Sequence, residues 1–206
     1  TLIFCNQKHQ CEQLKDDLWE EKLHASALHG DMEQYERDRT LIQFSNKSTS
    51  ILVATDVAAR GLDINELDLV INFELSADPE VHVHRVGRTG RAGRAGTAAS
   101  LVMRSEENRL AAINNYRHTS HETLSPDILP AWGNVKLYPP MVTLSIGGGK
   151  RDKLRPGDLL GALTASKEID GISIGKINVL DKITYVALAQ ESAKTALGLL
   201  NEGKIK

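Results

Sequence analysis

Three short segments of this 206-residue sequence combine glycine with charged side chains in a way that suits phosphate chemistry. They are HGDMEQYER (29–37), ATDVAARGLDI (54–64) and HRVGRTGRAG (84–93). In the third, Arg85, Arg88 and Arg91 recur every three residues, and the intervening glycines let the backbone approach a ligand closely. A guanidinium is always charged, and its planar fork matches phosphate oxygens. Two of these arginines are therefore predicted to grip a triphosphate; the alternative is a set of surface arginines in salt bridges.

The second segment carries two carboxylates beside a glycine. Asp56 and Asp63 flank Arg60-Gly61. A carboxylate next to a glycine turn can hold a ribose hydroxyl, or it can pair with a nearby arginine. Thr55 is suited to donate a hydrogen bond to an RNA phosphate. The alternative for each aspartate is that it caps a helix.

The elements that must position these segments follow from the hydrophobic pattern of residues 1–117. Short apolar runs alternate with amphipathic stretches, which predicts an α/β fold: a parallel sheet with helices on both faces. The expected strands are 2–5, 25–28, 51–54, 69–72 and 97–103, and the expected helices are 8–22, 33–44, a stretch from Pro79, and 106–117. In such sheets function concentrates in the loops beyond the carboxyl ends of the strands.

A second pattern begins at Met141, after a proline-rich stretch, 118–140, that we interpret as a linker. Strands are expected at 141–146, 172–179 and 183–189, and helices at 156–165 and 190–200. The order β-α-β-β-α lacks one strand of a four-stranded α/β sandwich, so we expect a last strand beyond Lys206. Because the chain begins directly on an apolar run, we also expect its natural N-terminus to lie upstream of Thr1.

A glycine-rich loop in this second region is strongly basic. It holds Lys150, Arg151, Lys153 and Arg155 just before a predicted helix, which favours phosphate binding over a merely solvated loop. The predicted strand 141–146 has no aromatic side chain, and the predicted strand 183–189 has only Tyr185. We therefore expect base stacking on the sheet to be minor and Lys176 or Lys182 to add to the basic surface.

Composition places few limits on function. The formal net charge is −2, with 41% hydrophobic and 25% charged residues, as in an ordinary globular protein. Residues 1–140 hold 15 Lys/Arg against 20 Asp/Glu, whereas residues 141–206 hold 10 against 7. No apolar run is long enough to cross a bilayer and no secretory signal is visible, so we expect a cytoplasmic protein. Cys5 and Cys11 are expected to be free thiols, and the scattered histidines predict no metal site.

In order and spacing, the three segments resemble motifs of the second RecA-like domain of DEAD-box RNA helicases, over residues 1–117. LIFCNQ (2–7) resembles the first motif of that domain, and Gln34 with Arg37 matches its Q-x-x-R element. The resemblance implies contacts with RNA from Gly30, Arg37 and Thr55. It implies contacts with the nucleotide from Gly61 and Asp63, an arginine-finger pair in Arg88 and Arg91, and a link to the catalytic carboxylates of another lobe through His84.

The same resemblance implies ATP with Mg²⁺ as the cofactor. An arginine finger contributes about 10³- to 10⁵-fold in rate. However, the sequence contains neither G-x-x-x-x-G-K-[ST] nor D-E-A-D, so the phosphate cradle and the Mg²⁺ ligands are expected in a first lobe that is not in this sequence. These 206 residues alone are therefore not expected to hydrolyse ATP.

The last region, 141–206, resembles the RRM-like RNA-binding domain of the DbpA subfamily. The resemblance rests on GGGKRDKLRPGDLLGALT (147–164) and IGKINV (174–179). It implies binding to a hairpin of large-subunit ribosomal RNA and a role in ribosome assembly. Two alternatives stay open: a non-catalytic RNA-binding or assembly protein, and a helicase of another subfamily whose tail binds protein. Self-association is also open.

Overall fold

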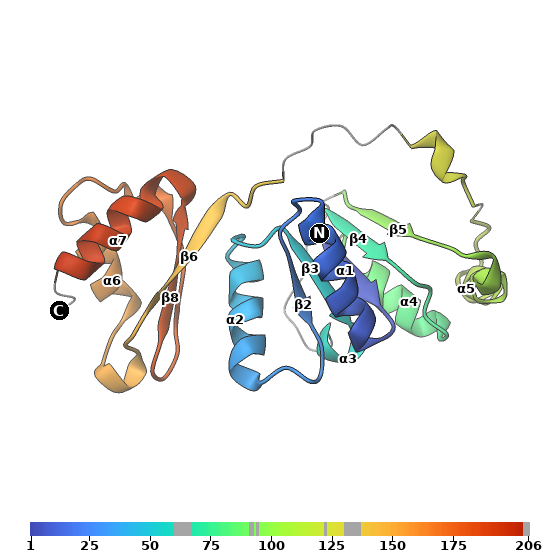
Figure 1. Cartoon of the computed structure of the whole chain (residues 1–206), viewed down its shortest axis with the longest axis horizontal. Helices are drawn as coiled ribbons and strands as arrows, with labels where there is room; N and C mark the ends of the chain where they lie inside the picture. The colour runs from blue at the N-terminus through green and yellow to red at the C-terminus, as the bar shows by residue number, and fades with distance from the viewer. Residues whose placement is uncertain (60–66, 91–92, 94, 122, 130–136, 204–206) are drawn as a thin grey trace. The chain divides into compact units, whose positions relative to one another are not determined.

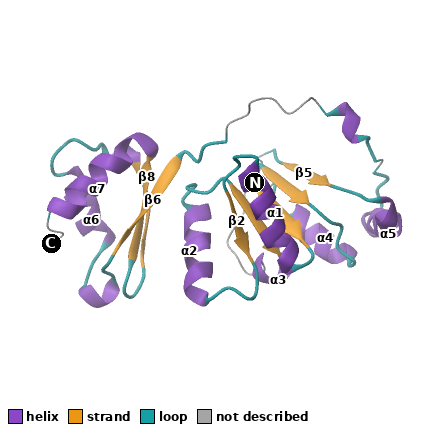
Figure 2. Cartoon of the chain, in the orientation of Figure 1, coloured by secondary structure: helices purple, strands orange, loops and turns teal. Residues whose placement is uncertain are grey.

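The computed structural model describes the chain except for residues 60–66, 91–92, 94, 122, 130–136 and 204–206. The described residues form two compact units, 1–37 with 51–137 and 38–50 with 138–206. Each unit has its own sheet and its own helices (Figures 1 and 2). The predicted linker contains a short 3-10 turn, Pro126–Ile128, at which the Ser125 hydroxyl accepts a hydrogen bond from Asp127 N. The predicted boundaries at 117 and 141 stay predictions.

The sheet of the first unit has five parallel strands in the order β2-β3-β1-β4-β5, which confirms the predicted parallel sheet. The strands are β1 (Leu2–Cys5), β2 (Ala25–Leu28), β3 (Ile51–Thr55), β4 (Leu69–Asn72) and β5 (Thr97–Ser100). The apolar runs form the central strands because a parallel strand is covered on both faces. The edge strand β5 is exposed along its whole length and ends three residues earlier than predicted.

The helices of residues 1–137 are α1 (Lys8–Glu20), α2 (Gln34–Ser45), α3 (Asp56–Ala59), α4 (Pro79–Val86) and α5 (Glu107–Arg117). The division between the two units falls within α2, after Arg37. The sequence pattern did not predict α3, which is only one turn long. Pro79 is the first residue of α4, as predicted, and the Asp78 side chain caps this helix by accepting from Glu80 N at 2.9 Å.

Both faces of this sheet are covered, as alternate residues of β1 demonstrate. Ile3 and Cys5 pack with Cys11 of α1 in one core cluster. Successive side chains of a strand point to opposite faces, so Leu2 and Phe4 face the other side. They are buried as well, and Arg85 of α4 lies over the Phe4 ring, with its guanidinium carbon 5.1 Å from the ring centre. The predicted two-sided helical layer is therefore present.

The second unit contains a three-stranded antiparallel sheet in the order β6-β8-β7. Its strands are β6 (Met141–Ile146), β7 (Ile174–Val179) and β8 (Thr184–Ala189), and its helices are α6 (Pro156–Thr164) and α7 (Ala193–Glu202). Leu159 and Leu163 of α6, Ala196 of α7, and Val186 and Leu188 of β8 share one core. The order of elements is the predicted β-α-β-β-α.

No described helix is both long enough and apolar enough to span a membrane.

Candidate nucleotide and RNA sites

The carboxyl ends of the central strands of the first unit meet at one edge of the sheet. Cys5 of β1 pairs in register with Thr55 of β3, and Phe4 pairs with Asn72 of β4. The residues that follow these strands, Asn6 and Asp56 among them, are therefore neighbours. This is the edge at which ligands bind in open α/β sheets.

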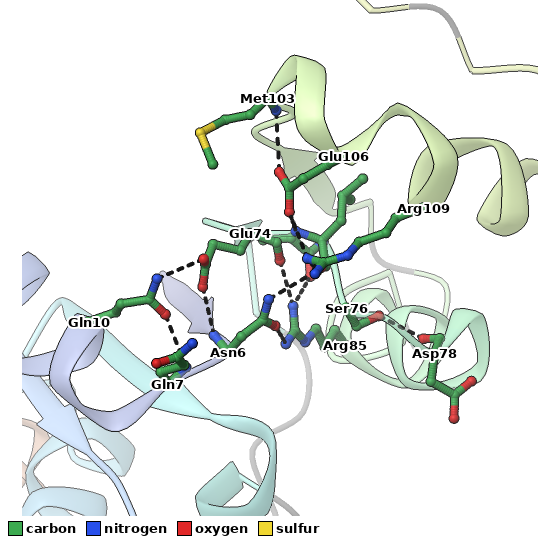
Figure 3. Close-up of polar contacts among 12 residues, drawn as sticks. Asn6, Gln7, Gln10, Glu74, Ser76, Asp78, Arg85, Met103, Glu106 and Arg109 are labelled. Carbon is green, nitrogen blue, oxygen red and sulfur yellow. Dashed lines mark hydrogen bonds and ion pairs between the residues drawn. The ribbon is translucent and has the colours of Figure 1, made fainter.

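Arg85 of α4 occupies the centre of this edge (Figure 3). Its side chain is 1% exposed and binds Asp56 through two hydrogen bonds, Nε to Oδ1 at 2.7 Å and Nη2 to Oδ2 at 2.6 Å. It also donates to Asn6 Oδ1 at 2.8 Å, to the Glu74 carbonyl at 2.8 Å and, more weakly, to Asn72 Oδ1 at 3.4 Å. All the acceptors follow or end strands, so one guanidinium ties α4 to three strand ends.

Despite their regular spacing, Arg85 and Arg88 of the third segment therefore have different environments. His82 and Arg85 are three residues apart on the buried face of α4, whereas His84 is exposed. Arg88 lies beyond the end of the helix, after the C-cap Gly87, and is half-buried. Arg85 is thus fixed by acceptors of its own unit, whereas Arg88 is the described arginine of this segment that lies beyond the end of the helix.

Arg88 and His84 border an open pocket of about 300 Å³. Phe4, Asp56, Ala59, Val81 and Arg85 complete its lining. A fixed cationic wall beside an exposed imidazole is chemically suited to an anionic ligand such as a phosphate chain. The remaining predicted nucleotide residues, Gly61, Asp63 and Arg91, lie outside the described residues.

The predicted RNA residues of the first unit lie on separate elements. Arg37, in α2, donates from Nη1 to the carbonyl of His29 at 3.1 Å and so fixes the loop that contains Gly30. Gly30 is exposed, and a Cβ atom there would meet nothing within 4 Å, so packing does not require glycine at this position. Thr55 ends β3 and directly precedes Asp56.

A buried glutamate anchors the loop that leads from β4 into α4. Glu106 is 5% exposed and accepts from Leu75 N and Met103 N, both at 3.2 Å. Arg109 donates to the same carboxylate at 3.1 Å and to the Leu75 carbonyl at 3.0 Å (Figure 3). These contacts fix where α4 starts, and hence where Arg85 and His84 lie.

The basic loop of the second unit is folded against the β7–β8 turn. Lys150 N donates to the Leu180 carbonyl at 2.8 Å, and Arg151 N donates to the Asp181 carbonyl at 3.0 Å. A Cβ on Gly149 would lie 2.7 Å from the Asp181 carbonyl and closer still to Leu180 O, so only glycine fits there. The loop's four basic side chains are exposed, namely Lys150, Arg151, Lys153 and Arg155.

The start of α6 is less open to a phosphate than the sequence pattern indicated. Asp158 accepts from Arg155 N at 2.9 Å, and Pro156 has no N–H to offer. A carboxylate of the chain itself therefore already uses the favourable N-terminal end of this helix. Anion binding in this loop must depend mainly on its exposed basic side chains.

Two further side chains of the second unit bear on RNA binding. Tyr185 is 3% exposed, so it is not available as a stacking platform. Lys176, a predicted RNA contact, is exposed and donates to Ser45 Oγ at 2.8 Å within the same unit. Among the residues that the structure describes, no group of three His, Cys, Asp or Glu side chains could hold a metal ion.

Comparison with known proteins assigns both units. Residues 1–93 match the family described as helicase conserved C-terminal domain, and residues 143–206 match the DbpA RNA binding domain. The whole chain is 49% identical to ATP-dependent RNA helicase DbpA of Escherichia coli and covers 44% of that protein. The chain belongs to the DEAD-box RNA helicases, in their DbpA subfamily. A DbpA of Bacillus subtilis is 33% identical over 100% of this chain and is covered to 47%. The chain thus spans less than half the length of these curated relatives.

Solved structures of DEAD-box proteins share the fold of the first unit. A DEAD-box protein from Methanococcus jannaschii is 40% identical over 58% of this chain, with a TM-score of 0.55 and 33% of that structure covered. The Escherichia coli DEAD-box protein SrmB, solved bound to RraA, is 36% identical over 56% of this chain, with a TM-score of 0.54 and 68% of that structure covered. Both neighbours support the RecA-like assignment of the parallel sheet.

Sequence reasoning missed the residues that hold this DEAD-box site together. The regular spacing groups Arg85 with the ligand-binding arginines, and no sequence pattern assigns a role to Glu74 or Glu106. The available signal was the possibility that Asp56 pairs with a nearby arginine, and this pair is observed with Arg85. Glu106 had no sequence signal for its contact with the β4–α4 loop, because Leu75 N lies about 30 residues away in the chain and next to it in space.

Proposed function

We propose that the intact protein is an ATP-dependent RNA helicase that remodels large-subunit ribosomal RNA during ribosome assembly. The observation that carries the proposal is that the third segment places three side chains at one pocket. Arg85 is bound to Asp56 at the sheet edge, and Arg88 and His84 border the open pocket beside it. A non-catalytic lobe would have no need of a second arginine that lines this pocket. This reasoning favours the helicase over the non-catalytic RNA-binding alternative.

In this proposal ATP with Mg²⁺ binds between the first unit and another RecA-like lobe outside these 206 residues. Arg88 and Arg91 hold the phosphates, Gly61 and Asp63 hold the nucleoside, and His84 contacts the partner lobe. The Mg²⁺ ligands belong to that lobe, so these 206 residues alone bind RNA without hydrolysing ATP. The cationic lining of the pocket fits a triphosphate.

The test is the RNA-stimulated ATPase rate of the full-length protein carrying Arg88→Ala. We expect a fall of about 10³-fold or more, the range for loss of an arginine finger. Arg104→Ala, which removes an exposed arginine of the same unit, is the matched control and is expected to retain the rate. Undiminished turnover by Arg88→Ala would refute the finger assignment.

We further propose that the second unit tethers the protein to a ribosomal RNA hairpin in the cytoplasm. Its exposed basic loop and the family of residues 143–206 support RNA as the ligand. Gly30, Arg37 and Thr55 of the first unit would then contact the strand that is being remodelled, and Lys176 would extend the basic surface of the second unit.

Titrating the 206-residue chain with hairpins of large-subunit ribosomal RNA and with unrelated duplexes, across a salt series, tests the tether. Replacing Lys150, Arg151, Lys153 and Arg155 by Gln should reduce the slope of log K against log salt by about 3, because each lost phosphate contact removes about 0.7–0.9. The control is the exposed pair Lys167→Gln with Lys194→Gln. Equal affinity for all RNAs would remove the hairpin assignment, and indifference to RNA would favour a tail that binds protein.

A further inference from the structure

We propose that Cys5 and Cys11 form a redox site at which a peroxide reversibly creates an intramolecular disulfide. They are the two cysteines of the 206-residue sequence, and both are free thiols. Neither residue is among those assigned to the nucleotide or to RNA. Only the effect of oxidation on turnover rests on the proposed function.

The two thiols meet although they lie on different elements. Cys5 is the last residue of β1, and Cys11 lies in the first turn of α1. Both are 0% exposed, they pack in the same core cluster, and their side chains are hydrogen-bonded to each other. Two groups held in contact react at a high effective concentration, because no chain ordering has to precede the reaction. The pair is therefore arranged for an S–S bond within one chain.

Hydrogen bonding makes one of the two sulfurs the nucleophile. The hydrogen bond from the Cys11 thiol lowers the pKa of Cys5, against the opposing effects of burial and of the Glu74 charge. The same hydrogen bond, together with burial, raises the pKa of Cys11, which stays a thiol. The thiolate is the reactive form of cysteine, and a buried cysteine without such a partner is inert. Cys5 is thus the attacking sulfur, and Cys11 is the resolving one.

The place of the pair in the chain selects the oxidant. Residues 6–9, which follow Cys5 and lead into α1, are exposed, whereas both sulfurs are covered. Hydrogen peroxide is small and uncharged, so it can reach a covered sulfur close to the surface. Oxidised glutathione is too bulky to do so. We therefore expect the folded chain to react with peroxide and to resist glutathione disulfide.

The reaction balances in two steps. The Cys5 thiolate attacks one peroxide oxygen, the O–O bond breaks, and the leaving hydroxide takes up the proton that Cys5 released, which gives a sulfenic acid and water. The Cys11 sulfur then attacks the Cys5 sulfur, the S–O bond breaks, and the departing hydroxide takes the Cys11 proton as a second water. Peroxide accepts the two electrons that the thiols lose. A dithiol such as dithiothreitol reverses the change.

Oxidation is expected to disturb the sheet edge because Cys5 directly precedes Asn6. Asn6 N donates to Glu74 Oε2 at 3.1 Å. Asn6 Oδ1 accepts from Arg85 at 2.8 Å. A disulfide closes a ring over residues 5–11, which contains Asn6. Drawing the two sulfurs together therefore displaces Asn6 from its partners, and turnover should fall.

The first test treats the 206-residue chain with hydrogen peroxide and follows its mass. The chain should lose the mass of two hydrogen atoms, peptide mapping should join Cys5 to Cys11, and dithiothreitol should restore both thiols. Met103, which is 60% exposed, is the internal reference, because its oxidation adds one oxygen atom. The disulfide should form before the Met103 sulfoxide. Sulfoxide at Met103 while both thiols stay reduced would overturn the inference.

Two substitutions of Cys11 separate the hydrogen bond from the S–S bond. Cys11→Ser keeps a donor to Cys5 but cannot form a disulfide, so oxidation should stop at a Cys5 sulfenic acid that dimedone traps. Cys11→Ala removes the donor, so its Cys5 should react more slowly, and it serves as a second variant should the serine variant fail to fold. Equal rates of Cys5 oxidation in the two variants, or a wild-type mass loss in Cys11→Ala, would contradict the assigned roles.

The effect on turnover is measured in the full-length protein. Peroxide should lower its RNA-stimulated ATPase rate by about 10-fold or more, since a misplacement of about 1 Å in a site can cost about 10²-fold. Dithiothreitol should restore the rate, and Cys11→Ala should keep its rate under the same treatment. Undiminished turnover by the mapped disulfide form would refute the effect on the sheet edge. The mass assay needs neither ATP nor RNA, so it decides the redox site even if the Arg88→Ala assay refutes the proposed function.

Discussion

Replacing Arg85 by Ala should destabilise the first unit by about 3 kcal/mol, because breaking a buried ion pair costs about 3–5 kcal/mol. The lower end applies because the Asp56 side chain is 29% exposed and water can hydrate it in part once its partner is gone. The acceptors Asn6 Oδ1 and Glu74 O also lose their donor. For a unit of roughly 120 residues, an unfolding entropy of about 2 cal/mol/K per residue converts this loss into a fall in Tm of about 12 °C.

Urea denaturation followed by the fluorescence of Trp19, which lies in α1 of this unit, measures the effect in a Trp132→Phe background. The double variant Arg85→Ala with Asp56→Ala should cost less than the sum of the two single variants, with a coupling energy of about 2 kcal/mol. A loss below about 1 kcal/mol for Arg85→Ala, or strictly additive single variants, would refute the view of Arg85 as a buried anchor.

Two further changes test other parts of the structure. Gly149→Ala should destabilise the second unit by about 1–3 kcal/mol, because its Cβ would collide with the carbonyls of Leu180 and Asp181. Circular dichroism during thermal unfolding measures this loss. Gly147→Ala, where a Cβ meets nothing within 4 Å, is the neutral control. His82 is buried, and this desolvation lowers its pKa from 6.5 to about 4. The unfolded state therefore takes up a proton more readily than the folded state. The contribution of neutral His82 to the free energy of unfolding is complete above about pH 6.5 and is lost as the pH falls towards 4, with about 2 kcal/mol lost by pH 5. His82→Asn should flatten that dependence between pH 7 and 5 in urea titrations of tryptophan fluorescence, and an unchanged slope would contradict the assignment.

The fold was largely predictable because its signals are local. The alternation of apolar runs with amphipathic stretches predicted the central strands, the main helices and the order of elements in both units. The one-turn helix α3 was not predicted, because four residues are too few for a periodic pattern, and the predicted strand 97–103 extends three residues beyond the end of β5. The glycine-rich basic loop was also predictable, although the capping of α6 by Asp158 depends on a side-chain conformation that spacing does not specify.

By itself, the sequence determined that His84, Arg85 and Arg88 lie close together, since they fall within five consecutive residues. Only the tertiary structure decided which of them turns inward, because that choice depends on Asp56, Asn6 and Glu74, which come from distant segments and meet at the ends of parallel strands. A spacing of three residues does not distinguish an arginine that binds a ligand from one that is buried in an ion pair of its own unit. Burial against Phe4 and a carboxylate of its own unit makes Arg85 the fixed arginine of the pocket that it lines together with His84 and Arg88.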